Sequence, residues 1–307
     1  MPYTTSYMMN KTYLSDSGPK VSPAIYGFHR WTEPQITADN MERIFNYCIS
    51  LGINTFDHAD TYGGYNCELV FGKVFTKSGL KREDVVLFSQ CGTNLPHRER
   101  SEYRIRHFNT SADHIRQSVE RSLNNLQTDY LDVFLLNQLD PISDLDETAI
   151  ALQQLKNAGK IRHIGIVNFS VFQHQLLSSR LRSPIVSNHI ELNLLNTSAF
   201  DNGQIDYIKQ RYMRPLALSP LADGLIAEGN DEKVVKLRKM LTELASHYKA
   251  DPESIAVAWL LKLGAMPVIG TLSEQRISRI VEAFDIELDH QDWYALYGAV
   301  RNENLHI

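Results

Sequence analysis

An acid and a phenol stand five residues apart in a segment that could carry acid–base chemistry. Asp57 follows a short strand-like run at 53–56, and Tyr62 lies in the loop before a helix-like run at 68–75. A phenol can donate a proton, and a nearby cation lowers its pKa from the ordinary value of about 10. The segment therefore predicts a proton-transfer site at the end of a buried strand, where enzymes built as βα barrels place their catalytic groups.

Short apolar runs alternate with longer segments of helical periodicity along the chain. This alternation predicts parallel strands with helices outside, and eight such units predict an α/β fold, the closed (β/α)8 TIM barrel. The predicted strands cover residues 24–26, 54–56, 85–88, 131–136, 163–166, 185–187, 215–218 and 267–269. No linker or low-complexity tract divides the sequence, so we expect a single domain over residues 1–307.

Several predicted helices carry signals at their ends. Ser170 and Asp251 are placed to cap helices, and Gly159 follows a helix that ends near residue 158. Residues 232–248 place apolar side chains at three- and four-residue steps on one face. We also expect a short N-terminal hairpin within 11–21, over the bottom of the barrel, and an extra C-terminal helix after residue 290.

Composition narrows the choice of partner and compartment. The net charge is −5, with acids and bases mixed along the chain, which argues against a nucleic-acid or anionic-membrane partner. The N-terminus lacks the pattern of a secretory signal, and no apolar run reaches the roughly 20 residues of a membrane span. The three cysteines form no Cys-x-x-Cys pair, so we expect packing roles, a reduced, cytoplasmic setting and no metal site.

The segment from Asp57 to Glu68 strongly resembles the signature of the aldo-keto reductases. The resemblance covers the chain from about Gly27 to Ala283. It implies reduction of a small aldehyde or ketone with NADP(H), with Tyr62 as the proton donor. Members of that family pair the Asp and Tyr with a Lys, which lowers the pKa of the Tyr, and with a His, which polarises the carbonyl. They are often monomers, so we expect a monomer or weak oligomer.

Two catalytic positions implied by the resemblance hold other residues. Gln90 stands where the family has Lys, and Asn137 where it has His. Gln90 carries no charge, so it cannot lower the pKa of Tyr62, and Asp57 loses its cation and tends to keep a proton. Asn137 still offers an N–H to a carbonyl oxygen. We expect activity to be lower by at least the ~10²–10⁴-fold typical of acid–base catalysis. Alternatively, Gln90 and Asn137 simply fill a disused site.

The positions implied for the nicotinamide end of the cofactor are altered. Asn168 matches the family's Asn, but Val167 replaces a Ser and His189 replaces a Gln, both of which hold the carboxamide. Leu218 replaces the aromatic residue that stacks on the ring. Contacts with the carboxamide are therefore expected to be fewer than in the family.

The phosphate end is better preserved. A loop at 219–224 matches the family's pyrophosphate loop, and the segment at 269–277 resembles the one that grips the adenosine 2′-phosphate, although Gly270 replaces a common Lys or Arg. The predicted phosphate contacts are Ser219, Leu221, Gly224, Thr271 and Arg276.

Three functions remain open from the sequence. The first is a slow NADPH-dependent reductase that uses Tyr62, with Asn137 orienting the carbonyl. The second is a non-catalytic relative that binds a nucleotide or a partner protein. The third is a cofactor-free lyase or isomerase that uses Tyr62, Asp57 and His189.

Overall fold

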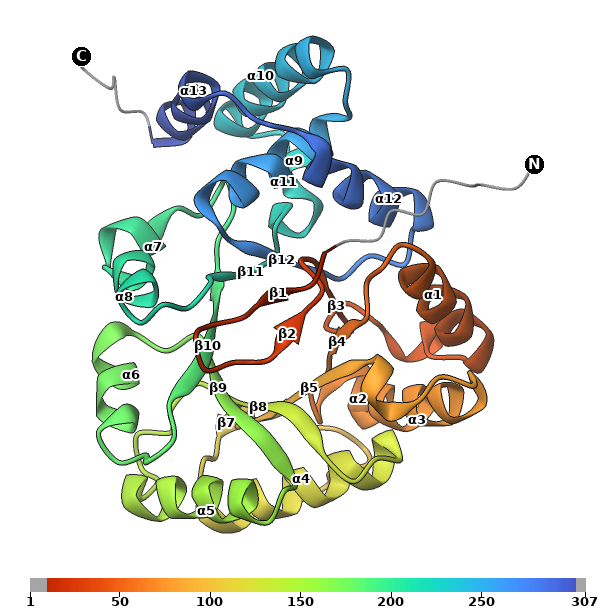
Figure 1. Ribbon diagram of the computed structural model, residues 1–307, viewed down its shortest axis with the longest axis vertical. Helices are drawn as coiled ribbons and strands as arrows, with labels where there is room; N and C mark the ends of the chain where they lie inside the picture. The colour runs from red at the N-terminus through yellow and green to blue at the C-terminus, as the bar shows by residue number, and fades with distance from the viewer. Residues whose placement is uncertain (1–9, 302–307) are drawn as a thin grey trace.

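Eight parallel strands close into a barrel (Figure 1). The computed structural model describes residues 10–301. The barrel strands are β3 (Ile25–Gly27), β4 (Thr55–Asp57), β5 (Val86–Cys91), β8 (Leu131–Asn137), β9 (Ile161–Val167), β10 (Ile185–Glu191), β11 (Leu216–Leu218) and β12 (Met266–Ile269). Pairing of β12 with β3 completes the circle. The predicted (β/α)8 fold and its eight strands are confirmed, and β5, β9 and β10 each extend beyond the predicted residues.

Helices surround the barrel (Figure 1). The longer ones are α1 (Ala38–Ser50), α3 (Cys67–Lys77), α4 (Ala112–Leu126), α5 (Leu145–Asn157), α6 (Val171–Ser178), α8 (Gln204–Gln210), α10 (Glu232–Tyr248), α11 (Pro252–Leu263), α12 (Glu274–Glu282) and α13 (His290–Arg301). Single-turn helices α2 (Tyr62–Tyr65), α7 (Ser198–Asp201) and α9 (Leu225–Glu228) lie in the connecting loops. The expected C-terminal helix is α13, and it lies beside α10 at the edge of the molecule.

The predicted helix caps are confirmed. The Ser170 side chain accepts a hydrogen bond from the N–H of Gln173, and Asp251 accepts one from the N–H of Glu253. Such caps satisfy N–H groups that the first turn leaves without partners. They fix where α6 and α11 begin.

The N-terminal hairpin plugs one end of the barrel. Strands β1 (Thr12–Tyr13) and β2 (Lys20–Val21) pair antiparallel, and the N–H of Arg214, before β11, donates to the carbonyl of Leu14. Leu14 and Val21 are fully buried against apolar side chains inside the barrel. Those interior residues are Ile25, Val86, Phe88, Val133, Leu135, Val167, Val186, Leu216, Met266 and Val268. Because the hairpin meets the strands where they begin, the bottom is sealed as predicted.

A second antiparallel pair lies in the long loop after β5. Strand β6 (Thr93–Asn94) pairs with β7 (His107–Phe108). This loop leaves the barrel at the carboxyl ends of the strands.

A close approach of α3 and α4 requires the glycine at position 72. A Cβ there would lie 2.1 Å from the carbonyl oxygen of Asn125 and 2.8 Å from the carbonyl carbon of Leu126. Both are backbone atoms of a helix that cannot yield by rotating a side chain. We therefore predict that Gly72→Ala lowers the free energy of unfolding by about 1–3 kcal/mol, the range for overpacked cores. Urea unfolding measures this change. Lys73→Ala, on the exposed side of α3, is the control; an equal loss in both variants would contradict the close-packing explanation.

Candidate active site

The loop after β4 brings the predicted phenol to the mouth of the barrel. Asp57 ends β4, and Tyr62 begins the single turn α2. Gly63 and Gly64 follow with φ values of 58° and 63°, in the left-handed region. A Cβ at Gly63 would lie 1.9 Å from Ile36 Cδ1, so the sharp turn needs glycine for both its backbone and its packing. The turn holds Tyr62 half-buried.

Tyr62 is hydrogen-bonded to the residue that replaces the expected lysine. Gln90, buried on β5, donates from Nε2 to the Tyr62 oxygen over 2.8 Å. The phenol is the acceptor in this bond, so its own hydrogen stays available for a substrate. Burial, with a smaller contribution from Asp57, raises the pKa of Tyr62 well above its ordinary value. The phenol is thus well placed as a donor, but it is a weak acid.

Asp57 is fully buried and has no hydrogen-bond partner for either carboxyl oxygen within residues 10–301. No hydrogen bond joins it to the Gln90 amide in that range, where Gln90 Nε2 donates to Tyr62. Burial raises the pKa of Asp57 to about 8. The carboxyl group therefore holds its proton at neutral pH, as expected for an acid that has lost its cation.

His189 faces Asp57 across the interior. Its Nε2 lies 3.8 Å from Asp57 Oδ1, and both side chains are fully buried. Strands β4 and β10 are four places apart around the eight-stranded barrel, so the two side chains meet from opposite walls. Burial lowers the pKa of His189 to about 3, which keeps the imidazole neutral. A neutral acid and a neutral base thus face each other there.

Asn137 ends β8, which pairs with the strand that carries Gln90. Its side chain is half-buried. In the described part of the chain, no hydrogen bond joins this side chain to Tyr62 or Gln90. The amide is therefore not tied to either of them and can turn toward a substrate.

Among the residues predicted to contact the nicotinamide end of the cofactor, Asn168 has an exposed polar side chain. Its backbone has a φ of 58° and donates to the carbonyl of His189 over 2.8 Å. Val167 beside it is buried, and Leu218 is half-buried. Of the predicted carboxamide contacts, only the Asn168 amide is both polar and exposed.

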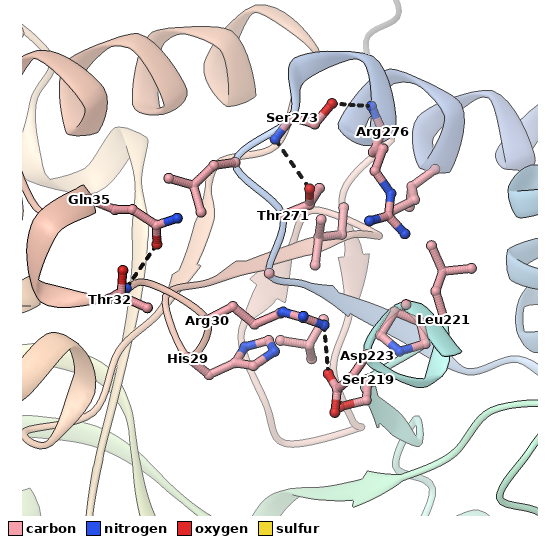
Figure 2. A pocket seen from close by; sticks show the side chains of 17 residues that line it. His29, Arg30, Thr32, Gln35, Ser219, Leu221, Asp223, Thr271, Ser273 and Arg276 are labelled. Carbon is pink, nitrogen blue, oxygen red and sulfur yellow. Dashed lines mark hydrogen bonds and ion pairs between the residues drawn. The ribbon is translucent and has the colours of Figure 1, made fainter. Parts of the chain in front are cut away.

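A cavity of about 470 Å³ lies at the ends of β3, β11 and β12 (Figure 2). Its volume falls in the usual range for ligand sites. All five residues predicted for the phosphate end line it, namely Ser219, Leu221, Gly224, Thr271 and Arg276. Residues 222–224 of its 219–224 loop have positive φ, and the N–H groups of Ala222 and Gly224 donate to the carbonyls of Ser219 and Leu221 within the loop.

Two guanidinium groups border this cavity, and each is paired with a carboxylate. Arg30 Nη1 lies 3.0 Å from Asp223 Oδ1, across the opening (Figure 2). Arg276 binds Glu253 through Nη2 at 2.7 Å and through Nε at 3.2 Å. A phosphate in the cavity would therefore meet guanidinium groups whose charge is partly neutralised. The Nη1 atom of Arg276 takes no part in its pair with Glu253.

Comparison with known proteins agrees with this geometry. The model of the "Aldo/keto reductase family" matches residues 24–300. The chain belongs to the aldo/keto reductase family. It is 36% identical over 287 residues to "Uncharacterized oxidoreductase YcsN" of Bacillus subtilis, covering 92% of this chain and 96% of that protein. It is 33% identical over 292 residues to "6-dehydroglucose reductase" of Agrobacterium fabrum, covering 94% and 97%.

A solved structure shows the same fold. The thermostable aldo-keto reductase Tm1743, in complex with the inhibitor epalrestat, superposes with a TM-score of 0.79. The match covers 95% of this chain and all of that one, at 23% identity. At this identity the likeness concerns the (β/α)8 fold alone.

Two buried acids of the segment from Asp57 to Glu68 have hydrogen-bond partners. Glu68, buried on α3, accepts a hydrogen bond from Ser89 over 2.6 Å. Asp60 accepts one from Ser118 over 3.2 Å, and burial raises its pKa to about 7. These bonds join α3 to β5 and the loop after β4 to α4.

Two residues of the site were missed in the sequence. His29 and Arg30 come after Phe28 in the loop that follows β3, and both line the cavity. The His29 ring meets the Tyr62 ring edge-on, with centroids 6.3 Å apart. Their place in the loop after a barrel strand was the available signal, since loops at that end carry function.

No metal centre is apparent in residues 10–301, where no three His, Cys, Asp or Glu side chains group as ligands. The three cysteines are buried and unpaired, which confirms their packing role. None of the helices described is long and apolar enough to cross a membrane.

The buried carboxyl of Asp57 should make folding depend on pH. Folded Asp57 keeps its proton up to about pH 8, whereas unfolded Asp loses it near pH 4, so stability falls as pH rises between them. His189 has the opposite effect on stability, but only below about pH 6.5. There the unfolded chain takes up a proton at His189, whereas folded His189 stays neutral down to about pH 3. Between about pH 6.5 and 7.5 we expect Asp57→Asn to remove a slope of up to about 1.4 kcal/mol per pH unit.

Urea unfolding at several pH values measures this slope. Asp206→Asn, at an exposed position on α8, is the matched control. Equal slopes for Asp57→Asn and the parent would show that Asp57 is ionised in the folded protein.

Proposed function

We propose that this chain is an oxidoreductase that binds NADP(H) and slowly reduces a small aldehyde or ketone at Tyr62. The observation that carries the proposal is the bond from Gln90 Nε2 to the Tyr62 oxygen. It holds the phenol at the mouth of the barrel and leaves the phenol's hydrogen free for a carbonyl oxygen. The relatives named oxidoreductase and reductase support the same reaction class.

The residues have distinct roles in this reaction. NADPH, when bound, supplies the hydride that reduces the carbonyl carbon. Tyr62 donates a proton to the oxygen, Gln90 positions the phenol, and Asn137 orients the carbonyl through its N–H. Tyr62 is left as a phenolate with no cation beside it, because Gln90 is neutral and Asp57 holds a proton. That unsupported charge is the physical reason to expect slow turnover.

The residues present fit the phosphate end of the cofactor better than they fit its nicotinamide end. Backbone groups of the 219–224 loop would hold the pyrophosphate, while Thr271 and Arg276 would hold the 2′-phosphate. Asn168 would hold the carboxamide. His189, which we predicted to contact the cofactor, would act from beneath it because its side chain is fully buried.

The substrate is proposed from the relatives. Two of them, including the one from Agrobacterium fabrum, are named 6-dehydroglucose reductase, so a sugar aldehyde is the first substrate to test. We further propose that the protein acts in the cytoplasm as a monomer or weak oligomer.

A second candidate function is nucleotide binding without turnover. The unpartnered Asp57 and the high pKa of Tyr62 favour it, because both reduce acid catalysis while leaving the cavity intact. A cofactor-free lyase or isomerase is favoured only by the facing pair Asp57 and His189. Cofactor binding and turnover, measured separately, distinguish the three functions.

Binding of the cofactor tests the phosphate site. We expect micromolar affinity for NADPH and weaker binding of NADH, since Arg276 keeps one guanidinium nitrogen for the 2′-phosphate. Arg276→Gln should weaken NADPH binding about tenfold or more, a typical loss for a charge-assisted bond, and change NADH binding little. Titration calorimetry measures both affinities. Arg116→Gln on α4 is the control, and no binding of either cofactor at millimolar concentration would overturn the proposal.

Restoring the family's catalytic residues tests the chemistry. The double variant Gln90→Lys, Asn137→His should raise the rate of carbonyl reduction by about 10²-fold or more, because an ammonium lowers the pKa of Tyr62 and an imidazole polarises the carbonyl. Steady-state oxidation of NADPH measures the rate. Tyr62→Phe should abolish turnover in both backgrounds. Undiminished turnover in Tyr62→Phe would remove the phenol from the mechanism.

A further inference from the structure

Two neighbouring strands of the barrel, β8 and β9, are each followed by a residue with an unusual backbone. Gln138 follows β8 with a φ of 62°, and Asn168 follows β9 with a φ of 58°. Both values lie in the left-handed region, which residues other than glycine adopt at a cost, although Asn does so more readily than most. Such residues cluster at ligand sites, where the surrounding structure holds them in place. The mouth of the barrel at β8 and β9 is therefore a candidate binding site.

The backbone of Gln138 is fixed from two sides. Its N–H donates to the carbonyl of Val167 over 3.0 Å, at the end of the ladder that joins β8 to β9. From the side of β5, Gly92 lies against the carbonyl of Asn137, because a Cβ at Gly92 would be 2.7 Å from that oxygen. The left-handed turn at Gln138 is thus held by contacts with both neighbouring strands.

The register of β8 and β9 places Gln138 beside Asn168. Asn137 pairs with Val167 in the last step of the ladder, so the next residues on the two strands are Gln138 and Asn168. Neighbouring strands lie about 4.8 Å apart. Because the strands are parallel and both residues have the left-handed backbone, their Cα–Cβ bonds point in similar directions. A ligand group that one amide reaches is therefore within reach of the other.

Neither amide is used by the described part of the chain. Within residues 10–301, no hydrogen bond involves the side chain of Gln138 or that of Asn168. Gln138 is half-buried and Asn168 is exposed. Each amide has two N–H donors and one acceptor oxygen, and a half-buried amide without a partner is costly. The pair matches a ligand group that also has both an acceptor oxygen and N–H donors, such as a primary amide.

We propose that Gln138 is a cofactor-binding residue, which holds the carboxamide of the nicotinamide together with Asn168. This assignment rests on the proposed function, in which Asn168 contacts that carboxamide. Gln138 lies outside the positions that the resemblance to the family implies for the cofactor. Its amide replaces part of the binding that the chain loses at Val167 and His189, where the family has Ser and Gln.

Two nucleotides separate binding of the carboxamide from binding of the phosphates. NADP⁺ carries the nicotinamide, whereas 2′-phospho-ADP-ribose has the same phosphates and lacks the nicotinamide. We expect Gln138→Ala to weaken binding of NADP⁺ about tenfold, a typical effect of losing hydrogen bonds to a neutral group. Its affinity for 2′-phospho-ADP-ribose should equal that of the parent. Titration calorimetry measures both affinities.

The chain offers a matched control for the backbone. Gln127 ends α4 with a φ of 53°, so Gln127→Ala makes the same change at another left-handed position, and it should leave both affinities unchanged. Gln138→Asn keeps an amide on a residue type that tolerates this backbone. It should therefore bind NADP⁺ more tightly than Gln138→Ala does. Equal losses in Gln138→Asn and Gln138→Ala would show that the amide is not the binding group and would overturn the assignment.

The outcomes keep this assignment separate from the proposed function. If the parent binds NADP⁺ and Gln138→Ala binds it equally well, Gln138 does not hold the carboxamide, while the proposed function stands. A loss of equal size for both nucleotides would indicate a structural effect and would also overturn the assignment. Failure of the parent to bind either nucleotide at millimolar concentration would overturn both proposals.

Discussion

The site is governed by one constraint, a carboxyl group buried in the barrel without a cation. Asp57 is fully buried, and no ammonium or guanidinium of residues 10–301 compensates it. A charged carboxylate there would carry a large desolvation cost, so the group stays protonated. It then neither repels an anion nor stabilises a cation. The neutral Gln90 and the neutral His189 are both compatible with that uncharged interior.

Loss of charge changes what Tyr62 can do, but not where it lies. Its position depends on the turn at Gly63 and Gly64 and on the bond from Gln90, neither of which needs an ion. Its acidity, in contrast, depended in the family on an ammonium. Geometry and acid strength are thus set by different residues here. This separation explains how Tyr62 can keep its position while the expected rate of carbonyl reduction falls.

The sequence predicted the barrel because apolar strands and amphipathic helices alternate over nearly the whole chain. The resemblance to the family also predicted five of the residues that line the cavity, since these belong to local segments at strand ends. The sequence could not predict that Gln90 bonds to Tyr62 instead of Asp57, because that choice depends on side-chain geometry between β4 and β5. Its miss of His29 had a different cause: the place of this residue after a barrel strand was a usable signal, whereas the contact of His29 with Gly270 joins positions far apart along the chain.

The two ends of the proposed cofactor site differ in what they demand of side chains. A phosphate can be held by backbone N–H groups, which depend less on residue identity than side-chain contacts do. A carboxamide needs side-chain donors and acceptors at fixed places, and Val167 and Leu218 offer none. Side-chain substitutions therefore weaken binding of the nicotinamide end more than binding of the phosphate end. A chain that kept the phosphate cavity while losing carboxamide contacts would bind the nucleotide yet hold its reactive ring loosely.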